Sequence, residues 1–367
     1  MKDRLRSQLV KLMMIPGLSG HEGRVRRQIS GSLDRVGCHS RSDRFGNLIA
    51  TLEGAPGLPS VMLFSHMDQV GFVVRKIRDD GLLRVERLGG VPERATASQA
   101  VTLSLADGTD VPGVIANKSH HATLPDEKYK VVQVSDALVD TGYGSREAVE
   151  AAGIRIGTPV VYTPRVLDLA GDRVAGTSID DRAGCAVLLE VAEALAGRDG
   201  GPTVHVVFSV QEEFNLRGAV VAAQALRPDI AIQLDIMLAT DTPGMEERGE
   251  MRLGSGPGLS LYSFHGRGTL NGVIPHPAMV KLITDTALSV GIPLQRSAQL
   301  GVLTDNSYVQ FVGDGVAAVD VGFPVRYTHS SLEVCDLGDL EALARLLVAS
   351  IDRIGPGFHL DREGAGL

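Results

Sequence analysis

Residues 204–213 read VHVVFSVQEE, an almost unbroken apolar run that ends in two adjacent glutamates. Such a run is typical of a strand buried on both faces of a parallel sheet. A second run, VMLFSHMD at 61–68, likewise ends in polar residues, here a histidine and an aspartate. We therefore expect parallel strands whose carboxyl ends carry chemically reactive side chains.

Helices and strands alternate around these two runs. Strands of this kind, connected by helices, predict a mostly parallel sheet covered by helices on both faces, so the expected fold class is α/β. The expected helices are 3–13, 21–36, 181–197, 218–226 and 336–354, and the further strands are 47–53, 230–237 and 316–321.

A different pattern fills residues 70–163. Short alternating segments are separated by turn dipeptides such as Asp80-Gly81 and Gly89-Gly90, which indicates a small β domain. We expect it to be inserted into one α/β catalytic domain formed by 1–69 and 164–355. The remaining stretch, 356–367, shows no periodicity and is expected to be a loose tail.

Composition excludes several classes of protein. The 367 residues suggest two domains at about 150 residues each. The 36 basic and 44 acidic residues give a net charge of −8, which argues against a nucleic-acid partner. No run approaches the ~18 apolar residues of a membrane span, and the amino terminus lacks the features of a secretory signal. The three widely spaced cysteines indicate free thiols in a reducing compartment, so we expect a cytoplasmic protein without a membrane partner.

Side chains suited to metal binding gather where the predicted strands end. Ligands of open α/β sheets bind just beyond the carboxyl ends of the strands. Each residue taken alone could have an ordinary structural role. Asp180 and Asp181 could cap a helix, and the two glutamates could lie on a solvent-exposed face. Two unpaired carboxylates at a buried rim would be costly, however, and a cation offsets that cost. The candidates are His66, Asp68, Asp180, Asp181, Glu212, Glu213, Asp235, Asp241 and His329.

The motifs around these positions resemble a known family. SHMDQVGF at 65–72, DDRAGCA at 180–186, QEEFNLRGA at 211–219 and YTHS at 327–330 are similar to the tetrahedral (TET) dinuclear aminopeptidases. This family includes glutamyl aminopeptidases and members called endoglucanases. The resemblance covers nearly the whole chain in order, and it implies a zinc-exopeptidase-like sheet with an inserted β-barrel-like domain.

The resemblance also implies a role for each candidate. Asp180 would bridge two metal ions, His66 and Asp235 would complete one site, and Glu213 and His329 the other. Asp241 remains the alternative to Asp235. Glu212 would be the general base, and Asp68 would orient His66.

The chemistry explains these residue types. Imidazole and carboxylate ligands suit two divalent ions, zinc first, with cobalt or manganese as alternatives. Such a pair lowers the pKa of a shared water toward about 7, so that a bridging hydroxide can attack. A carboxylate such as Glu212 can then accept a proton and pass it to the leaving amine.

We therefore expect a metallo-aminopeptidase that hydrolyses the amino-terminal residues of short peptides. The alternative is a related deacylase or amidohydrolase acting on amino-acid amides. Glycoside hydrolysis is disfavoured because it needs two carboxylates on opposite sides of a sugar, and adjacent glutamates are poorly placed for that.

Several positions depart from the family pattern. Gln69 stands where glutamate is frequent, Phe214-Asn215 replaces Val-Gly, Ile236-Met237 replaces Val-Thr, and LTDN at 303–306 replaces Gly-Thr-Asp-Ala. None removes a ligand or the base. They are expected to line the specificity pocket, so the preferred substrate residue stays open.

Further features concern assembly and residues outside the predicted metal site. The resemblance implies a homo-oligomer, commonly of twelve subunits, assembled through the inserted domain and helices. His120-His121 in that domain are expected to be surface residues or to contribute to a neighbouring subunit's pocket. His21, His205, His265 and His276 are expected to be structural, and Gly254–Gly258 a turn or a substrate wall.

Overall fold

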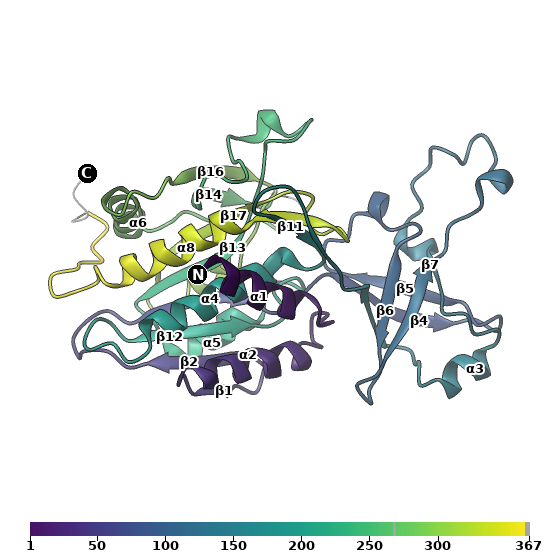
Figure 1. The fold of residues 1–367 in the computed structure, drawn as a ribbon, viewed down its shortest axis with the longest axis horizontal. Coiled ribbons are helices and arrows are strands. Elements are labelled where there is room, and N and C mark those ends of the chain that lie inside the picture. The colour runs from purple at the N-terminus through teal and green to yellow at the C-terminus, as the bar shows by residue number, and fades with distance from the viewer. Residues whose placement is uncertain (267–268, 364–367) are drawn as a thin grey trace.

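A nine-stranded sheet forms the centre of this computed structural model, in which residues 1–266 and 269–363 are described (Figure 1). The sheet has antiparallel pairs toward both edges and parallel strands in the middle. Its strand order is β1 (Ser40–Ser42), β2 (Leu48–Leu52), β12 (Val204–Ser209), β3 (Val61–His66), β13 (Ile230–Leu238), β17 (Ala317–Val325), β14 (Gly258–Phe264) and β15 (Gly272–Val273), with β16 (Gln295–Leu300) paired to β14.

The four central strands, β12, β3, β13 and β17, run parallel. Every residue of β3 and β17 is buried, as the continuous apolar runs predict. Because parallel strands end at the same edge of a sheet, the segments that follow them meet there. The predicted α/β class is confirmed, with the parallel arrangement strongest in the centre of the sheet.

Helices cover both faces of the sheet. One face packs against α1 (Lys2–Met13), α2 (Gly23–Arg35), α4 (Ile179–Leu195), α6 (Pro277–Ser289) and α8 (Leu337–Ile351) in a single large apolar core. The other face packs against α5 (Gly218–Leu226) and the short α7 (Asn306–Val309) in a smaller core. Helix α4 contacts α1, α8 and the sheet, so it is buried on all sides.

A closed six-stranded barrel lies beside the sheet, on the right in Figure 1. Its apolar core is separate from that of the sheet and includes an edge-to-face contact between Phe72 and Tyr162 at 6.0 Å. Its strands follow the order β4 (Gly71–Ile77), β5 (Leu83–Leu88), β8 (Leu138–Asp140), β7 (Asp110–Ile115), β6 (Ala100–Ser104) and β9 (Pro159–Tyr162), and α3 (Arg146–Ala151) lies between β8 and β9 in the chain. The boundaries of the inserted domain at residues 70 and 163 remain a prediction.

A small antiparallel sheet connects distant parts of the chain. Its strands are β10 (Val166–Asp168), β11 (Arg173–Gly176) and β18 (Glu333–Asp336). The short 3₁₀ turns are Glu93–Ala95, His120–Ala122, Val134–Asp136 and Glu246–Arg248. Pairing of β11 with β18 sets Gly176 opposite Glu333, shortly before Asp180.

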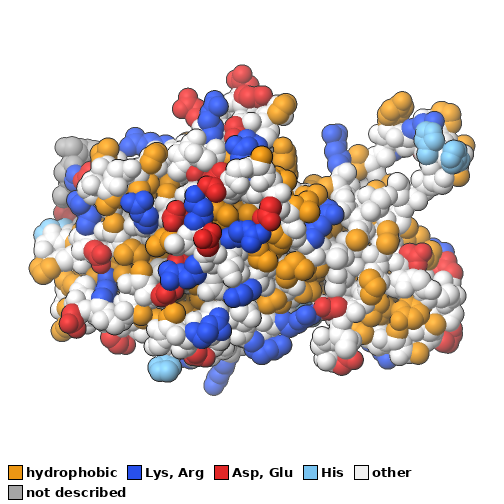
Figure 2. All heavy atoms as spheres, viewed as in Figure 1, with side chains coloured by type: hydrophobic (Ala, Val, Ile, Leu, Met, Phe, Trp, Pro, Cys, Tyr) orange, Lys and Arg blue, Asp and Glu red, His pale blue; other side chains and the backbone are white. Residues whose placement is uncertain are grey.

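The carboxyl-terminal stretch forms neither helix nor strand over residues 356–363, and Phe358 and Leu360 pack against the large core. The end of the predicted tail, 364–367, lies outside the described residues. On the face shown in Figure 2, acidic and basic side chains are interspersed and form no single basic patch. Within the described chain, every helix is too short or too polar to cross a membrane.

Candidate metal centre and active site

The ends of three parallel strands bring the predicted side chains together. His66 is the last residue of β3 and lies opposite Ser209, the last residue of β12. Glu212 and Glu213 follow in the next loop, and Asp235 belongs to the neighbouring strand β13. Residues far apart in the sequence therefore meet at one edge of the sheet, as expected for an open α/β fold.

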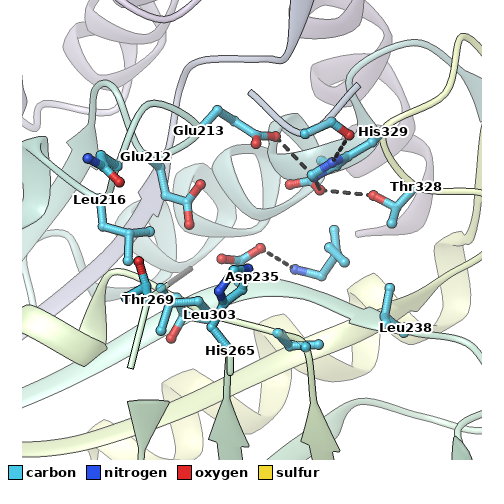
Figure 3. Close-up of a pocket in the computed structure, with 17 residues that line it drawn as sticks. Glu212, Glu213, Leu216, Asp235, Leu238, His265, Thr269, Leu303, Thr328 and His329 are labelled. Carbon is cyan, nitrogen blue, oxygen red and sulfur yellow. Dashed lines mark hydrogen bonds and ion pairs between the residues drawn. The ribbon is translucent and has the colours of Figure 1, made fainter. Parts of the chain in front are cut away.

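Asp180 lies between two histidines. Its Oδ1 is 3.1 Å from Nε2 of His66, and its Oδ2 is 3.3 Å from Nε2 of His329. Glu213 Oε1 is also 3.3 Å from that second nitrogen. Figure 3 shows Glu213, His329 and Thr328 converging at this point, where Thr328 donates its hydroxyl to Asp180 Oδ2 at 2.9 Å. One carboxylate thus presents its two oxygens to two different imidazoles.

Both histidines have their other ring nitrogen occupied by a carbonyl group. His66 Nδ1 is 3.1 Å from the backbone oxygen of Asp68, and His329 Nδ1 is 3.0 Å from that of Gly90. A carbonyl oxygen only accepts, so each Nδ1 carries a proton, and each imidazole in its neutral form would present the Nε2 lone pair to a metal ion. This tautomer is the one that a metal ligand needs. The carboxylate of Asp68, the predicted partner of His66, lies slightly farther from Nδ1, at 3.5 Å.

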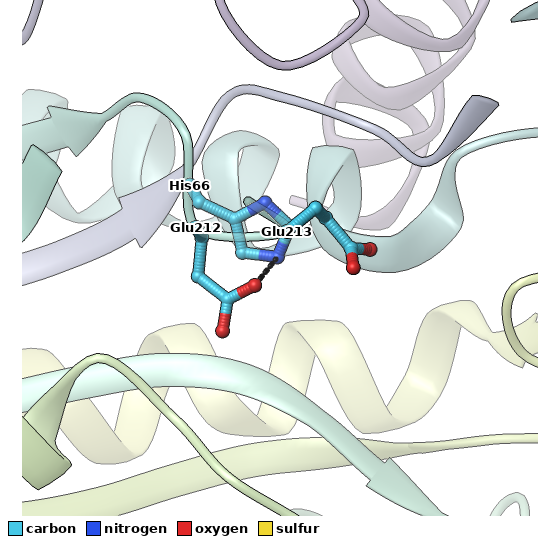
Figure 4. A group of neighbouring side chains, drawn as sticks. All are labelled: His66, Glu212 and Glu213. Carbon is cyan, nitrogen blue, oxygen red and sulfur yellow. Dashed lines mark ion pairs between the residues drawn. The ribbon is translucent and has the colours of Figure 1, made fainter. Parts of the chain in front are cut away.

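Asp68 also fixes the two adjacent glutamates. Its Oδ1 accepts the backbone N–H of Glu212 at 3.0 Å, and its Oδ2 accepts that of Glu213 at 3.1 Å. Figure 4 shows the two glutamate side chains beside His66, with Glu212 Oε2 4.0 Å from its Nε2. The adjacency therefore lets Glu213 approach His329 while Glu212 stays beside His66.

Electrostatics at this site strongly favour a bound cation. Burial raises the pKa of Glu213 to about 7, against the opposing effect of His329. Burial also raises the pKa of Glu212 and of Asp235 well above the usual range, and neighbouring carboxylates add to both shifts. Burial acts the same way on Asp180, but hydrogen bonds from the two histidines outweigh it and lower its pKa. Within the described chain, no lysine or arginine pairs with these carboxylates, so a metal cation would offset their burial.

Three groups of side chains have ligand atoms close enough to hold a metal ion. In each, the ligand atoms lie within 4.8 Å of one another. Two of the groups share Asp180, and imidazole and carboxylate ligands of this kind suit zinc, cobalt or manganese. The groups are His66, Asp180 and Asp235; Asp180, Glu213 and His329; and His66, Glu212 and Glu213.

The structure gives the two candidate aspartates different surroundings. Asp235 is nearly buried, and its Oδ2 accepts a hydrogen bond from Gln233 at 3.1 Å. Asp241 instead forms a two-point ion pair with Arg326, at 2.8 and 2.7 Å. Asp235 lies within β13, which runs one residue beyond the predicted 230–237 and stays paired with β17 to Leu238. These contacts favour Asp235 as the ligand.

Glu333 is a functional residue that sequence reasoning missed. It accepts the backbone N–H of Asp180 at 2.9 Å and that of His329 at 2.6 Å, and its carboxylate also lies 3.2 Å from the Thr328 hydroxyl oxygen. Burial and the nearby Asp180 carboxylate raise its pKa to about 8. The available signal was a lone acid within the short apolar stretch 332–335.

Asp181 is likewise buried beneath the cluster. It accepts hydrogen bonds from the Ser65 hydroxyl and the N–H of Gly184, and burial raises its pKa to about 8. Its carboxylate therefore faces β3 and α4 and takes no part in the three ligand groups. The helix-capping interpretation suits Asp181 and does not suit Asp180.

A cavity of about 420 Å³ opens beside the cluster, a size ordinary for small-ligand sites. His265, predicted to be structural, lines this cavity, and its buried Nδ1 has no hydrogen-bond partner within the described residues. The other cavity walls are mainly neutral or aliphatic, apart from the cluster itself.

Two other features of the sequence lie apart from this site. His120 and His121 are exposed on a loop of the barrel domain. The backbone N–H groups of Gly254 and Gly256 are occupied by the carboxylate of Asp339, at 2.8 and 2.7 Å. That glycine-rich stretch is therefore a turn, and its donors are unavailable to an anion.

The fold and the cluster at its strand ends define the class of the protein: a peptide-bond hydrolase built on an α/β sheet. Residues 46–346 match the model of the M42 glutamyl aminopeptidase family, so the chain belongs to that family. SgcX of Escherichia coli strain K12, provisionally named an aminopeptidase, is 39% identical over 95% of this chain and 94% of its own. The lysyl aminopeptidase of Pyrococcus furiosus is 30% identical over 94% of this chain and 96% of its own.

Solved structures support the same assignment. Aminopeptidase APDkam598 from the archaeon Desulfurococcus kamchatkensis superposes with a TM-score of 0.90 at 32% identity, covering 97% of each chain. The TET1 peptidase of Pyrococcus horikoshii, described as assembling into a tetrahedron or a large octahedral shell, gives a TM-score of 0.85 at 27% identity, covering 95% of this chain and 99% of its own. The resemblance stated from the sequence is thus confirmed at the level of the family.

Proposed function

We propose that the protein is a dinuclear metal-dependent aminopeptidase that removes amino-terminal residues from short peptides. The observation that carries this proposal is the position of Asp180 between His66 and His329, with one carboxylate oxygen facing each Nε2 atom. A carboxylate shared in this way suits a pair of cations a few ångströms apart.

The ligands divide into two sets that share Asp180. His66 and Asp235 complete one set, and Glu213 and His329 complete the other. Zinc is the expected metal, with cobalt or manganese as alternatives, because the donors are nitrogen and oxygen. Two such ions would acidify a water molecule and polarise the peptide carbonyl group.

Glu212 is the proposed general base. Its carboxylate lies beside His66, outside the two ligand sets, and its backbone is held by Asp68. From this position it can accept a proton from the attacking water and pass it to the leaving amine. Asp68 holds this geometry and does not itself exchange the proton.

The side chains that line the cavity favour action at the amino terminus of a peptide. Four carboxylate side chains line it: Asp180, Glu212, Glu213 and Asp235. Among its described lining residues there is no lysine or arginine that could bind the carboxylate end of a peptide. An α-amino group is therefore accommodated better than an α-carboxylate.

The proposal is tested with metal-loaded protein and aminoacyl-anilide substrates. We expect two equivalents of metal per chain and hydrolysis that a chelator abolishes. Glu212→Gln should keep both metals and lose activity by a factor of about 10² to 10⁴. Full activity of this variant would refute the role of Glu212. Faster cleavage of N-acyl amino acids than of aminoacyl-anilides would favour the deacylase alternative.

We further propose that the protein forms a homo-oligomer, with up to twelve subunits, and that residues 70–163 contribute to assembly and substrate access. The TET1 peptidase, described as assembling into a tetrahedron or an octahedral shell, supports this proposal. Light scattering should therefore give a mass many times that of one chain. A monomer at working concentration would contradict it.

A further inference from the structure

We infer that the site selects peptides whose amino-terminal residue has an aliphatic, uncharged side chain, such as leucine or methionine. This inference rests on the proposed aminopeptidase function and specifies its substrate class. It is argued from the cavity walls outside the proposed metal ligands and base.

Aliphatic side chains from three segments surround the space next to Asp235 and Glu212. Leu216 follows β12, Leu238 ends β13, and Leu303 follows β16. Figure 3 shows Leu216 and Leu303 on one side of Asp235 and Leu238 on the other. Since each segment contributes an apolar side chain, a substrate side chain placed there exchanges water for hydrocarbon contacts.

Three aliphatic residues of this wall also line a narrow second cavity, whose other lining residues are mostly polar. Ile236, Leu238 and Val302 line both spaces, and the second has a volume of about 30 Å³. A hydrocarbon side chain held in the first cavity therefore meets aliphatic residues on this side as well.

An acidic substrate side chain would find no cationic side chain to pair with in the same space. The charged groups of the cavity wall are the carboxylates of the cluster, and its described residues include no lysine or arginine to pair with glutamate. Burying an unpaired carboxylate is costly, so glutamyl peptides are expected to be poor substrates.

A basic side chain would also lack a free partner. Asp320 borders the narrow cavity, but its two oxygens already accept hydrogen bonds from Thr304 at 2.9 Å and Asn306 at 2.6 Å. Asp241 is paired with Arg326. A lysine ammonium group would therefore lose its hydration without gaining an uncommitted carboxylate outside the metal cluster.

The test is a panel of leucyl-, methionyl-, phenylalanyl-, glutamyl- and lysyl-anilides with the zinc- or cobalt-loaded protein. We expect kcat/KM for leucine and methionine to exceed that for glutamate and lysine at least tenfold, because one mismatched group in such a pocket changes rates by about 10–200-fold. Leu303→Arg places a cation in the wall, so it should lower the leucine-to-glutamate ratio at least tenfold.

Leu300→Arg is the matched control. It adds the same charge three positions earlier, at an exposed side chain outside the cavity wall, and should leave the ratio unchanged. Thermal unfolding of both variants shows whether each remains folded. An unchanged ratio in folded Leu303→Arg would overturn the assignment of this wall.

The other outcomes separate the inference from the proposed function. A preference for glutamate or lysine in the native protein would overturn the inference alone. If the native protein prefers glutamate and Arg267→Ala loses that preference, Arg267 determines the specificity. Arg267 lies outside the described residues. If no anilide is cleaved by the metal-loaded protein, the proposed function fails, and the inference fails with it.

Discussion

Replacement of Glu333 by glutamine should weaken metal binding although Glu333 belongs to neither proposed ligand set. One carboxylate oxygen of Glu333 accepts the N–H of His329, and the other accepts the N–H of Asp180. Glu333 therefore holds the backbone of two proposed ligands at once. Residues that orient metal ligands in this way commonly affect metal affinity strongly.

The expected size of the effect follows from these two backbone hydrogen bonds. Glutamine keeps one carbonyl oxygen. If that oxygen accepts the N–H of His329, the NH₂ group faces the N–H of Asp180. One buried donor then lacks an acceptor, at a cost of about 1–3 kcal/mol. If Asp180 shifts to relieve this contact, metal affinity should fall by about 10–100-fold.

The assay is a competition between the protein and a chromophoric chelator for zinc at pH 9. This pH lies above the pKa of about 8 to which burial raises the Glu333 carboxyl group, so the native residue is ionised. Asp241→Asn serves as the matched control. It breaks the ion pair with Arg326 and should lower stability without lowering metal affinity.

Two results would refute this reasoning. Wild-type zinc affinity in Glu333→Gln would show that the two backbone hydrogen bonds do not position the ligands. Loss of one metal from Asp241→Asn would identify Asp241 as a ligand in place of Asp235. Urea unfolding of the metal-free variants separates a loss of affinity from a loss of fold.

Two further predictions concern stability. The buried guanidinium group of Arg182 lies 3.5 Å from the side-chain oxygen of Gln69. Gln69→Glu should give it a carboxylate partner and raise the free energy of unfolding by about 1–3 kcal/mol, measured by thermal or urea unfolding. A lower melting temperature of this variant would contradict the prediction. Burial raises the pKa of Asp320 from 3.8 to about 6 in the folded protein. The folded state thus binds more protons than the unfolded state between about pH 4 and pH 6, and stability falls across this window as pH rises, by about 3 kcal/mol. Asp320→Asn removes this titration. The free energy of unfolding of the variant, relative to that of the native metal-free protein, should therefore increase from pH 4 to pH 6 and stay constant above pH 6. If the difference between the two free energies does not change with pH, Asp320 does not titrate in this range.

The arrangement of the sheet was largely predictable because its strands bury both faces. The apolar side chains at 61–64 and 204–210 lose contact with water only inside the protein, so these strands are expected to be buried on both faces. Helices between the strands favour parallel pairing. Strands β14 and β16 were not predicted. Their sequences, GLSLYSF and QRSAQL, mix polar and apolar residues without a clear period, and their burial is correspondingly uneven.

The sequence by itself determined which residue types stand at the strand ends, since they follow the apolar runs directly in the chain. It therefore yielded His66, Glu212, Glu213 and the family motifs around them. The relation of Asp180 to two histidines could be expected only through the family resemblance, because these residues come from segments more than a hundred positions apart.

Only the tertiary structure decided where individual side chains point. The sequence left Asp241 open as the alternative to Asp235. In the structure, Arg326, 85 positions from Asp241, pairs with Asp241, and Asp235 lies beside His66 and Asp180. The hydrogen bonds from Asp180 and His329 to Glu333 likewise arise from contacts between distant segments, and so does the cavity wall at Leu303. Such contacts depend on strand register and loop geometry, which local patterns of hydrophobicity do not specify.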